Sequence, residues 1–238
     1  MRTNKILLTI FIVSFIFLNG CSSIPSNIGG SVGGYIGGSV GGSFSNAYKA
    51  ISSLISGYED YPITRELVDQ IPYASLRMKI GKGPAGLLIL ESKKGDEYTW
   101  VSADNIYIVT KWGRIIRAQG LTNNLTDIYS SEPSFKEILQ SSDLTGENFR
   151  YVSLDNPEAF GIRVKVSYTK IGSEGVSILD RTRQLILIEE KIENAYIKWR
   201  HTNKYWVDQE TGFVMQSFQV IAPNLPPILI QITKKPSQ

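Results

Sequence analysis

Short runs in which apolar and polar residues alternate, separated by clusters of turn-forming residues, fill most of the chain after residue 73. The clearest run covers residues 160–168, where large apolar residues stand two apart: Phe160, Ile162, Val164, Val166 and Tyr168. A period of two puts these side chains on one face of a half-buried antiparallel strand. A sheet of many such strands exposes its edges unless it closes on itself. We therefore expect a mainly β fold, an antiparallel meander that curls into a barrel or a sandwich, with short flanking helices.

About ten strands and three short helices are expected from these patterns. The strands are expected at 74–80, 87–92, 98–102, 105–110, 114–119, 160–168, 184–199 (as one strand or two), 205–207, 213–221 and 228–232. The helices are expected at 47–58, 64–70 and 132–140. Thr64 is suited to cap the second helix, and Pro133 is suited to the start of the third. His201 is expected in a turn between strands.

The N-terminus has the order of residue types found in a bacterial secretion signal. A basic start precedes an apolar run at residues 6–18, which is too short to cross a bilayer comfortably. Leu18-Asn19-Gly20-Cys21 follows directly and resembles the lipobox of bacterial lipoproteins, in which a peptidase cuts before a cysteine whose sulfur carries the lipid. Residues 1–20 are therefore predicted to be a signal peptide. Cys21 is predicted to carry acyl chains such as palmitate, which anchor the mature chain to a membrane.

Residues 21–46 have no charged side chain, and a Gly-Gly-X-X sequence recurs within them from Gly29 to Phe44. Two interpretations stay open. As a flexible tether, the segment would span roughly 25–30 Å between a membrane and a domain. As a helix, it would place its glycines in one stripe, a pattern suited to close helix contact in a membrane or an oligomer. Residues 47–238 are expected to form one β-rich globular domain.

The balance of charges argues against a nucleic-acid partner. The 238-residue chain has 25 basic and 22 acidic side chains, and loss of Arg2 and Lys5 with the signal peptide leaves 23 basic against 22 acidic, a net charge of +1. No basic cluster of the kind that binds nucleic acid remains. Cys21 is the single cysteine, so no disulfide forms within the chain and the fold depends on its hydrophobic core.

The sequence contains no recognisable catalytic constellation. His201 is the single histidine, so a Ser-His-Asp triad would have to include it, and a metal site with two histidines cannot form. Glu189 and Glu190 are adjacent, and adjacent side chains of a strand point to opposite faces. They therefore do not form the carboxylate pair that glycosidases use. We expect no enzymatic activity, no metal site and no cofactor.

Three of the four tryptophans are candidates for binding a glycan. Trp112, Trp100 and Trp206 offer aromatic faces that could pack against the apolar faces of sugar rings. Trp112 is the strongest of them, because it stands in an expected hairpin turn and has less to pack against. The alternative is that these side chains pack the sheet, as aromatic residues of β-proteins commonly do.

Several short motifs stand in a characteristic order along the chain. They are Gln70 to Leu76, Trp100 with Asp104-Asn105, Gly113 to Ile116 with Asn123 to Leu125, Tyr205 to Asp208, Thr211-Gly212 and Gln216-Ser217. Their order and spacing resemble the YjbF/GfcB family of group 4 capsule lipoproteins of Gram-negative bacteria, over residues 48–236. The resemblance implies an outer-membrane lipoprotein with a β-rich domain, encoded among capsule or exopolysaccharide export genes. It supplies no catalytic residues.

These observations together predict a lipid-anchored protein of the cell outer membrane that faces the periplasm. Ser22 after the cysteine resembles the signal for outer-membrane delivery. The expected role is to assist secretion or assembly of capsule or exopolysaccharide by binding export proteins or the polysaccharide itself. The alternative is a lipid-binding or envelope-maintenance protein that carries an acyl chain in a curved sheet. A wide apolar interior would favour this alternative, and a filled interior would count against it.

Overall fold

The computed structural model describes residues 62–144, 146–223 and 225–237. The predicted signal peptide, Cys21, the Gly-rich segment 21–46 and the helix expected at 47–58 lie outside these residues. The described elements are α2 (Arg65–Gln70), β1 (Ser75–Ile80), β2 (Ala85–Lys94), β3 (Glu97–Ser102), β4 (Tyr107–Lys111), β5 (Arg114–Gln119), β6 (Leu125–Ser130), α3 (Phe135–Gln140), β7 (Asn148–Asp155), β8 (Glu158–Ile178), β9 (Arg181–Asn194), β10 (Trp199–Val207), β11 (Val214–Gln219) and β12 (Ile228–Lys234).

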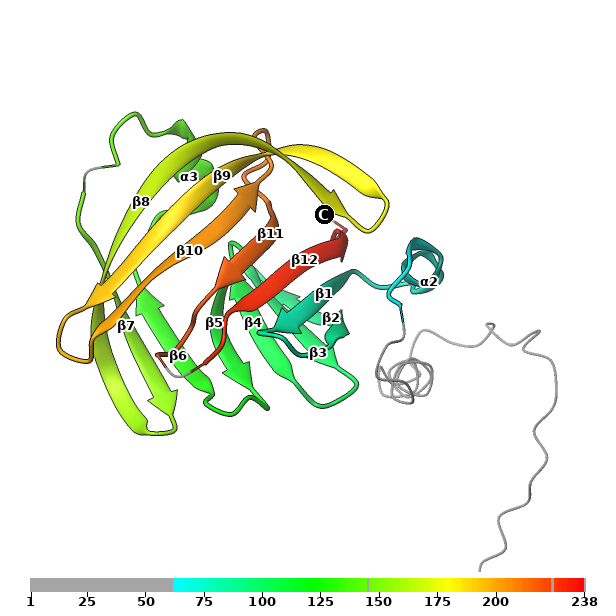
Figure 1. Cartoon of the computed structure of the whole chain (residues 1–238). Helices are drawn as coiled ribbons and strands as arrows, with labels where there is room; N and C mark the ends of the chain where they lie inside the picture. The colour runs from blue at the N-terminus through cyan, green and yellow to red at the C-terminus, as the bar shows by residue number, and fades with distance from the viewer. Residues whose placement is uncertain (1–61, 145, 224, 238) are drawn as a thin grey trace, which may run out of the picture. The chain divides into compact units, whose positions relative to one another are not determined.

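The twelve strands of the described residues form one antiparallel sheet with the order β5-β4-β3-β2-β1-β12-β11-β10-β9-β8-β7-β6. β1 pairs with β12, so the first and last described strands lie side by side. β5 and β6 form the two ends of the sheet, and curling of the sheet brings these ends together (Figure 1). Arg117 of β5 and Asp127 of β6 approach to 3.5 Å across this gap, which we call the seam. The predicted meander is confirmed as a nearly closed barrel.

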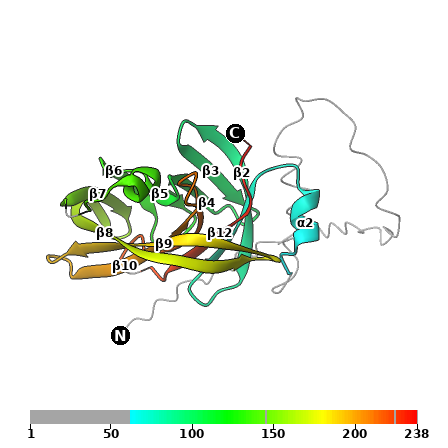
Figure 2. The same ribbon diagram turned by 90° about the horizontal axis from the view of Figure 1, so that it is seen from above.

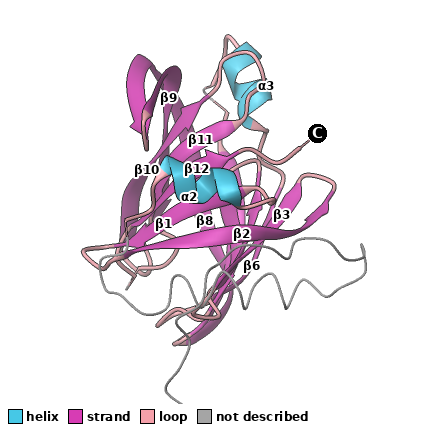
Figure 3. Ribbon diagram, turned by 90° about the vertical axis from the view of Figure 1, so that its right-hand side faces the viewer, coloured by secondary structure: helices cyan, strands magenta, loops and turns pink. Residues whose placement is uncertain are grey.

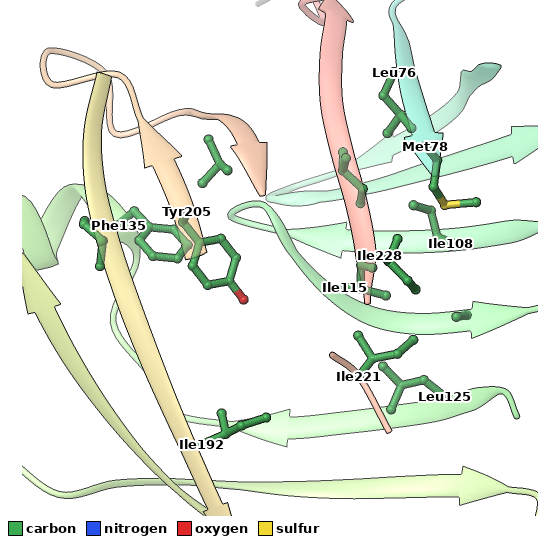
Figure 4. Packing of buried hydrophobic residues seen from close by; sticks show 14 of the residues in the cluster. Leu76, Met78, Ile108, Ile115, Leu125, Phe135, Ile192, Tyr205, Ile221 and Ile228 are labelled. Atoms are coloured by element: carbon green, nitrogen blue, oxygen red, sulfur yellow. The ribbon is translucent and has the colours of Figure 1, made fainter. Parts of the chain in front are cut away.

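Seen from above, β8, β9, β10 and β12 lie along one side of the barrel, and β2 to β6 lie along the other (Figure 2). One apolar cluster occupies the space between them and draws side chains from all twelve strands and from α3. Fully buried members include Leu76, Trp100, Ile108, Leu125, Phe135 and Tyr205, several of which are drawn in Figure 4. The interior is therefore filled by the protein's own side chains.

Two strands were not predicted from the sequence: about ten were expected, and the described residues form twelve. Leu125 is the one buried residue of β6, and the sequence of this strand shows little apolar alternation. β7 alternates, but one of its inward positions is occupied by Arg150 instead of an apolar residue. The run 184–199, expected as one strand or two, is divided between β9 and β10 by a turn at residues 195–198.

Phe160 is a further correction, because its side chain is 70% exposed although the alternating pattern predicted that it would be buried. Val164, Val166 and Tyr168 of the same run are buried as predicted. Gly161 has a φ of +63°, and the pairing of β7 with β8 shifts register between Val152 and Leu154. The alternation of faces is broken there, so the buried part of the run begins after residue 161.

α2 lies on the outside of the barrel, against β12 and β2 (Figure 3). The Thr64 side chain accepts a hydrogen bond from the Leu67 backbone N–H at 3.3 Å, so the predicted N-cap is confirmed. Arg65 Nη1 donates to the Thr233 carbonyl at 2.8 Å. Val68 of the helix is fully buried and packs in a small apolar cluster with Leu87.

α3 begins at Phe135, two residues after the expected start at Pro133. Ser134 is its N-cap and forms a capping box with Glu137, in which the Ser134 side chain accepts from the Glu137 N–H and the Glu137 carboxylate accepts from the Ser134 N–H. Phe135 and Ile138 are the buried residues of the helix. The Phe135 ring lies 4.5 Å from the Tyr205 ring, so the start of α3 is fixed against the interior of the barrel.

Candidate functional site

Four charged side chains are buried together inside the barrel. They are Arg114 of β5, Glu132 of the segment before α3, Arg150 of β7 and Glu190 of β9, and we call them the buried ion cluster. Arg150 donates to both oxygens of Glu132 at 2.8 and 2.9 Å, and its Nη2 also donates to Glu190 Oε1 at 2.6 Å. Arg114 Nε donates to Glu190 Oε1 at 3.0 Å and lies 3.6 Å from Glu132 Oε2. Two positive and two negative charges therefore balance inside the barrel.

Polar side chains of the neighbouring strands complete the hydrogen bonding of this cluster. Asn203 Nδ2 and Tyr205 Oη donate to Glu190 Oε2 at 2.9 and 3.1 Å. Burial alone would raise the pKa of the Glu190 carboxyl, but the charges of Arg150 and Arg114 and the hydrogen bonds from Arg150 and Asn203 outweigh burial and lower its pKa to about 2. Burial also raises the pKa of the Tyr205 phenol, which stays neutral.

The chemistry that the buried ion cluster offers is electrostatic. A carboxyl group with a lowered pKa has no proton to donate at neutral pH, whereas the acid of a glycosidase needs a raised pKa. The two adjacent glutamates point to opposite sides, as the sequence predicted: Glu190 is buried in the barrel, and Glu189 lies 3.5 Å from the half-exposed Lys204. The cluster joins strands on both sides of the seam, and we interpret it as a structural tie across the barrel.

His201 lies within β10, and the prediction that it stands in a turn is wrong. It pairs with Ile192 of β9, because the turn between these strands comes earlier, at residues 195–198. Its ring centroid lies 6.4 Å from that of Phe218, and burial lowers the pKa of the imidazole. Among the described residues, no group of three or more His, Cys, Asp or Glu side chains is placed to hold a metal ion.

A cavity of about 370 Å³ lies where five separate parts of the chain meet, and we call it the mouth cavity. Its rim comes from the β2–β3 turn, the β4–β5 hairpin, the start of α3, the β10–β11 turn and the C-terminal tail, and residues of β1, β3, β11 and β12 form its inner wall. Its apolar surface is formed mainly by Leu76, Trp100, Val214, Met215, Ile230 and Ile232, and its charged residues are Lys93, Asp96, Lys136 and Lys235. Cavities of this size in the mouths of β-barrels are common places for small ligands.

Trp112 stands at the tip of the β4–β5 hairpin and lines the mouth cavity. Gly113 follows with a φ of +83°, and a Cβ atom at this position would lie 2.4 Å from Val214 Cβ. Only glycine therefore allows the hairpin tip to pack this closely on β11. The Lys111 ammonium lies 4.7 Å from the Trp112 ring, within the range of a cation–π contact.

A second cavity, of about 290 Å³, lies at the seam between β5 and β6, and we call it the seam cavity. Trp112 contributes to both cavities. Arg114, Arg150 and Glu132 of the buried ion cluster also line the seam cavity. Arg117 pairs with Glu97 at 2.5 Å and with Asp127 at 3.5 Å, so an ion-paired arginine bridges the two edges of the seam.

The structure brings two of the three candidate tryptophans to one site. Trp100 is buried, donates to Thr110 Oγ1 at 3.0 Å and forms part of the wall of the mouth cavity, which Trp112 also lines. Trp206 lies on β10 and donates to Glu174 Oε2 at 2.7 Å, and it lines neither cavity. The buried ion cluster was not predicted from the sequence. A charged residue at an inward strand position, such as Arg150 two residues before the buried Val152, is the signal that could have indicated it.

None of the helices in the described part of the chain is both long and apolar enough to cross a membrane. Residues 62–237, apart from 145 and 224, form a nearly closed twelve-stranded antiparallel barrel with a ligand-sized cavity at one end. The chain belongs to the YjbF family: the model of that family, described as group 4 capsule polysaccharide lipoprotein gfcB, YjbF, matches residues 48–233. The family predicted from the order of the motifs is thus confirmed.

Two lipoproteins of Escherichia coli (strain K12) are similar to the chain, and both are described as uncharacterized. GfcB is 23% identical over 190 residues, which cover 74% of this chain and 83% of GfcB. YjbF is 21% identical over 187 residues, which cover 74% of this chain and 82% of YjbF. The crystal structure of the hypothetical lipoprotein YmcC from the same organism matches with a TM-score of 0.67 at 21% identity, covering 81% of this chain and 97% of YmcC. This last similarity shows a shared fold.

Proposed function

We propose that this lipoprotein is lipid-anchored through Cys21 at the outer membrane and assists secretion or assembly of a capsule or exopolysaccharide by binding the glycan, without catalysing a reaction. The observation that carries the proposal is the mouth cavity, which is lined by the half-buried Trp112 and by the buried Trp100. The chain also belongs to a family that is described by its link to capsule polysaccharide. Aromatic faces and a few polar groups around an apolar wall are the features with which proteins hold small ligands in concave sites. Contact with export proteins is a second part of the same role.

A non-catalytic role is supported by the state of the most buried carboxylate. Glu190 is held ionised by two arginines, and its lowered pKa leaves no proton for acid catalysis. Glu132 is likewise engaged by both nitrogens of the Arg150 fork. Both carboxylates are thus committed to ion pairs within the protein.

The alternative function, carriage of an acyl chain inside the sheet, has less support. The interior between the two sides of the barrel is filled by side chains from every strand. A buried ion cluster crosses the same interior, and charged groups are poor neighbours for a hydrocarbon chain. Lipid found in the purified protein by mass spectrometry, beyond the chains attached to Cys21, would favour this alternative.

The proposal is tested with a deletion strain in which secreted and surface polysaccharide are measured. The strain is complemented with the wild type or with Cys21→Ala, and immunoblots verify equal amounts of protein. The proposal predicts lost polysaccharide that is restored by the wild type and not by Cys21→Ala. Unchanged polysaccharide in the deletion strain would contradict a role in export.

A further inference from the structure

We propose that the mouth cavity selects a carboxylate-bearing sugar, with the ring held by aromatic side chains and the carboxylate held by lysines. This inference rests on the proposed function, because it names the class of glycan that the same cavity would bind. Three observations carry it: the placement of aromatic rings around the cavity, the sign of its charges, and the state of its neutral polar groups.

Three half-buried aromatic rings reach the cavity from three different elements. Tyr98 comes from β3, Trp112 from the β4–β5 hairpin and Phe213 from the β10–β11 turn. Two of the rings have a lysine of the cavity lining near the ring face: Lys93 lies 5.7 Å from the Tyr98 centroid and Lys235 lies 5.3 Å from the Phe213 centroid. Lys111 lies 4.7 Å from the Trp112 centroid but lines the seam cavity. An apolar ring face beside a positive charge suits a ligand that carries an apolar ring face beside a negative charge.

The charges that line the cavity are mainly positive. Lys93, Lys136 and Lys235 face a single acidic residue, Asp96, in a protein whose basic and acidic side chains are almost equal in number. Lys235 lies 3.5 Å from Asp208, so part of its charge is already compensated. Lys93 and Lys136 therefore supply most of the positive charge available to a ligand.

The position of Lys136 is fixed by close packing. It is the second residue of α3, after the capped start of the helix. The helix backbone at Lys136 lies so close to Gly212 that a Cβ atom on that glycine would be 2.7 Å from Lys136 Cα. Gly212 has a φ of +71°, so the turn that carries Phe213 and the helix that carries Lys136 are held together at the cavity.

Several neutral polar groups of the cavity wall are already hydrogen-bonded within the protein. Thr110 Oγ1 accepts from Trp100 Nε1, Gln216 Oε1 accepts from Gln231 Nε2, and Ser134 Oγ caps α3. An ammonium group has three N–H donors, so the lysines keep donors for a ligand. A wall whose charged donors are mainly cationic favours an anionic sugar over a neutral one.

Isothermal titration calorimetry on the full mature lipoprotein tests the inference, in a detergent without a sugar headgroup. The probes are tetragalacturonic acid and its fully methyl-esterified form, which share the same rings and differ in charge. We expect the acid to bind at least about tenfold more tightly than the ester, the size of one charge-assisted hydrogen bond. Raising the salt concentration should weaken binding of the acid and leave binding of the ester nearly unchanged.

Lys93→Gln/Lys136→Gln is the informative variant, and Lys82→Gln is its matched control. Lys82 is an exposed lysine in the β1–β2 turn, which lies at the opposite end of the strands from the β2–β3 turn. The double variant should lose the preference for the acid, and the control should keep it. If both variants unfold thermally at nearly the same midpoint temperature as the wild type, their folding is intact.

The outcomes separate this inference from the proposed function. Equal binding of the acid and the ester would overturn the selection of a carboxylate and leave glycan binding in place. Binding of neither probe would overturn the inference, and the deletion strain would still decide the role in polysaccharide export. A further outcome is displacement of the acid by inorganic phosphate or acetate at a similar concentration. That result would show that the cavity binds any small anion and does not recognise the sugar ring, and it would also overturn the inference.

Discussion

Replacement of Glu190 by glutamine would remove one negative charge from the buried ion cluster while keeping the size of the side chain. The carboxylate receives hydrogen bonds from Arg114 at 3.0 Å and from Arg150 at 2.6 Å, and it is fully buried. Without it, two buried guanidinium groups would share the single carboxylate of Glu132. Breaking a buried ion pair in this way costs about 3–5 kcal/mol in the free energy of unfolding.

The glutamine amide would also disturb the hydrogen bonds on the other side of the carboxylate. Asn203 Nδ2 and Tyr205 Oη both donate to Glu190 Oε2. An amide nitrogen at that position would donate instead of accept, so it would face the Asn203 donor. This conflict places the expected loss toward the upper part of the range.

Glu189→Gln is the matched control, because the residue is adjacent and carries the same charge on the other side of the strand. Glu189 lies 3.5 Å from Lys204, and both side chains are partly exposed, so the expected loss is only about 0–1 kcal/mol. Urea unfolding of the mature lipoprotein in detergent, followed by tryptophan fluorescence, measures both variants. Equal losses for the two variants, or a loss below about 1 kcal/mol for Glu190→Gln, would refute the assignment of the cluster as a structural tie.

Two further predictions concern acid stability and the hairpin at the mouth cavity. Folding lowers the pKa of Glu190 from 4.5 to about 2, which adds about 3 kcal/mol to the free energy of unfolding above pH 4.5. This stabilisation is lost as the pH falls toward 2. Urea midpoints should therefore fall more steeply over this range for the wild type than for Glu190→Gln, and parallel curves would contradict the assignment. Gly113→Ala should lower the free energy of unfolding by about 2–5 kcal/mol, because of the left-handed φ and the contact with Val214. Gly95 also has a positive φ, +59°, but open space surrounds it, so Gly95→Ala should lower the free energy of unfolding by only about 1–2 kcal/mol. Equal losses at the two glycines, measured by urea unfolding, would contradict the close packing of the hairpin on β11.

Features that depend on a few neighbouring residues were predictable from the sequence. The N-cap at Thr64 needs only the helix that follows it. The turn after β10 is similar: Asp208 Oδ1 accepts from the Thr211 N–H at 3.0 Å, and Gly212 takes the positive φ. The Trp112-Gly113 hairpin was also predicted, because two strand-like runs flank a two-residue turn. In each case the determining contacts lie within a few residues along the chain.

The buried ion cluster and the strand β7 were not predictable in the same way. Arg150 meets Glu132 and Glu190 across separations of 18 and 40 residues, and Arg114 meets Glu190 across 76 residues. Alternation of apolar residues is the signal for a strand, and an inward arginine interrupts it. A buried charge is acceptable only because distant partners neutralise it, and these partners are known only once the barrel has formed.

Which candidate residues line the mouth cavity could also not be predicted from the sequence alone. Trp112 and Trp100 were singled out by residue type, and the structure places both at the cavity. Trp206 has the same chemistry but lies elsewhere, with its indole bonded to Glu174. Lys136 gave no signal in the sequence, because its position depends on the packing of α3 against Gly212.

Secreted polysaccharide in a deletion strain complemented with Trp112→Ala or with Trp206→Ala tests the central claim most directly, with immunoblots to verify equal protein. Both variants remove one half-buried indole, but only Trp112 lines the mouth cavity. We expect the strain with Trp112→Ala to secrete about as little polysaccharide as the deletion strain, and the strain with Trp206→Ala to secrete nearly as much as the wild type. Wild-type polysaccharide with Trp112→Ala, or the same loss with both variants, would contradict a role for the mouth cavity in export.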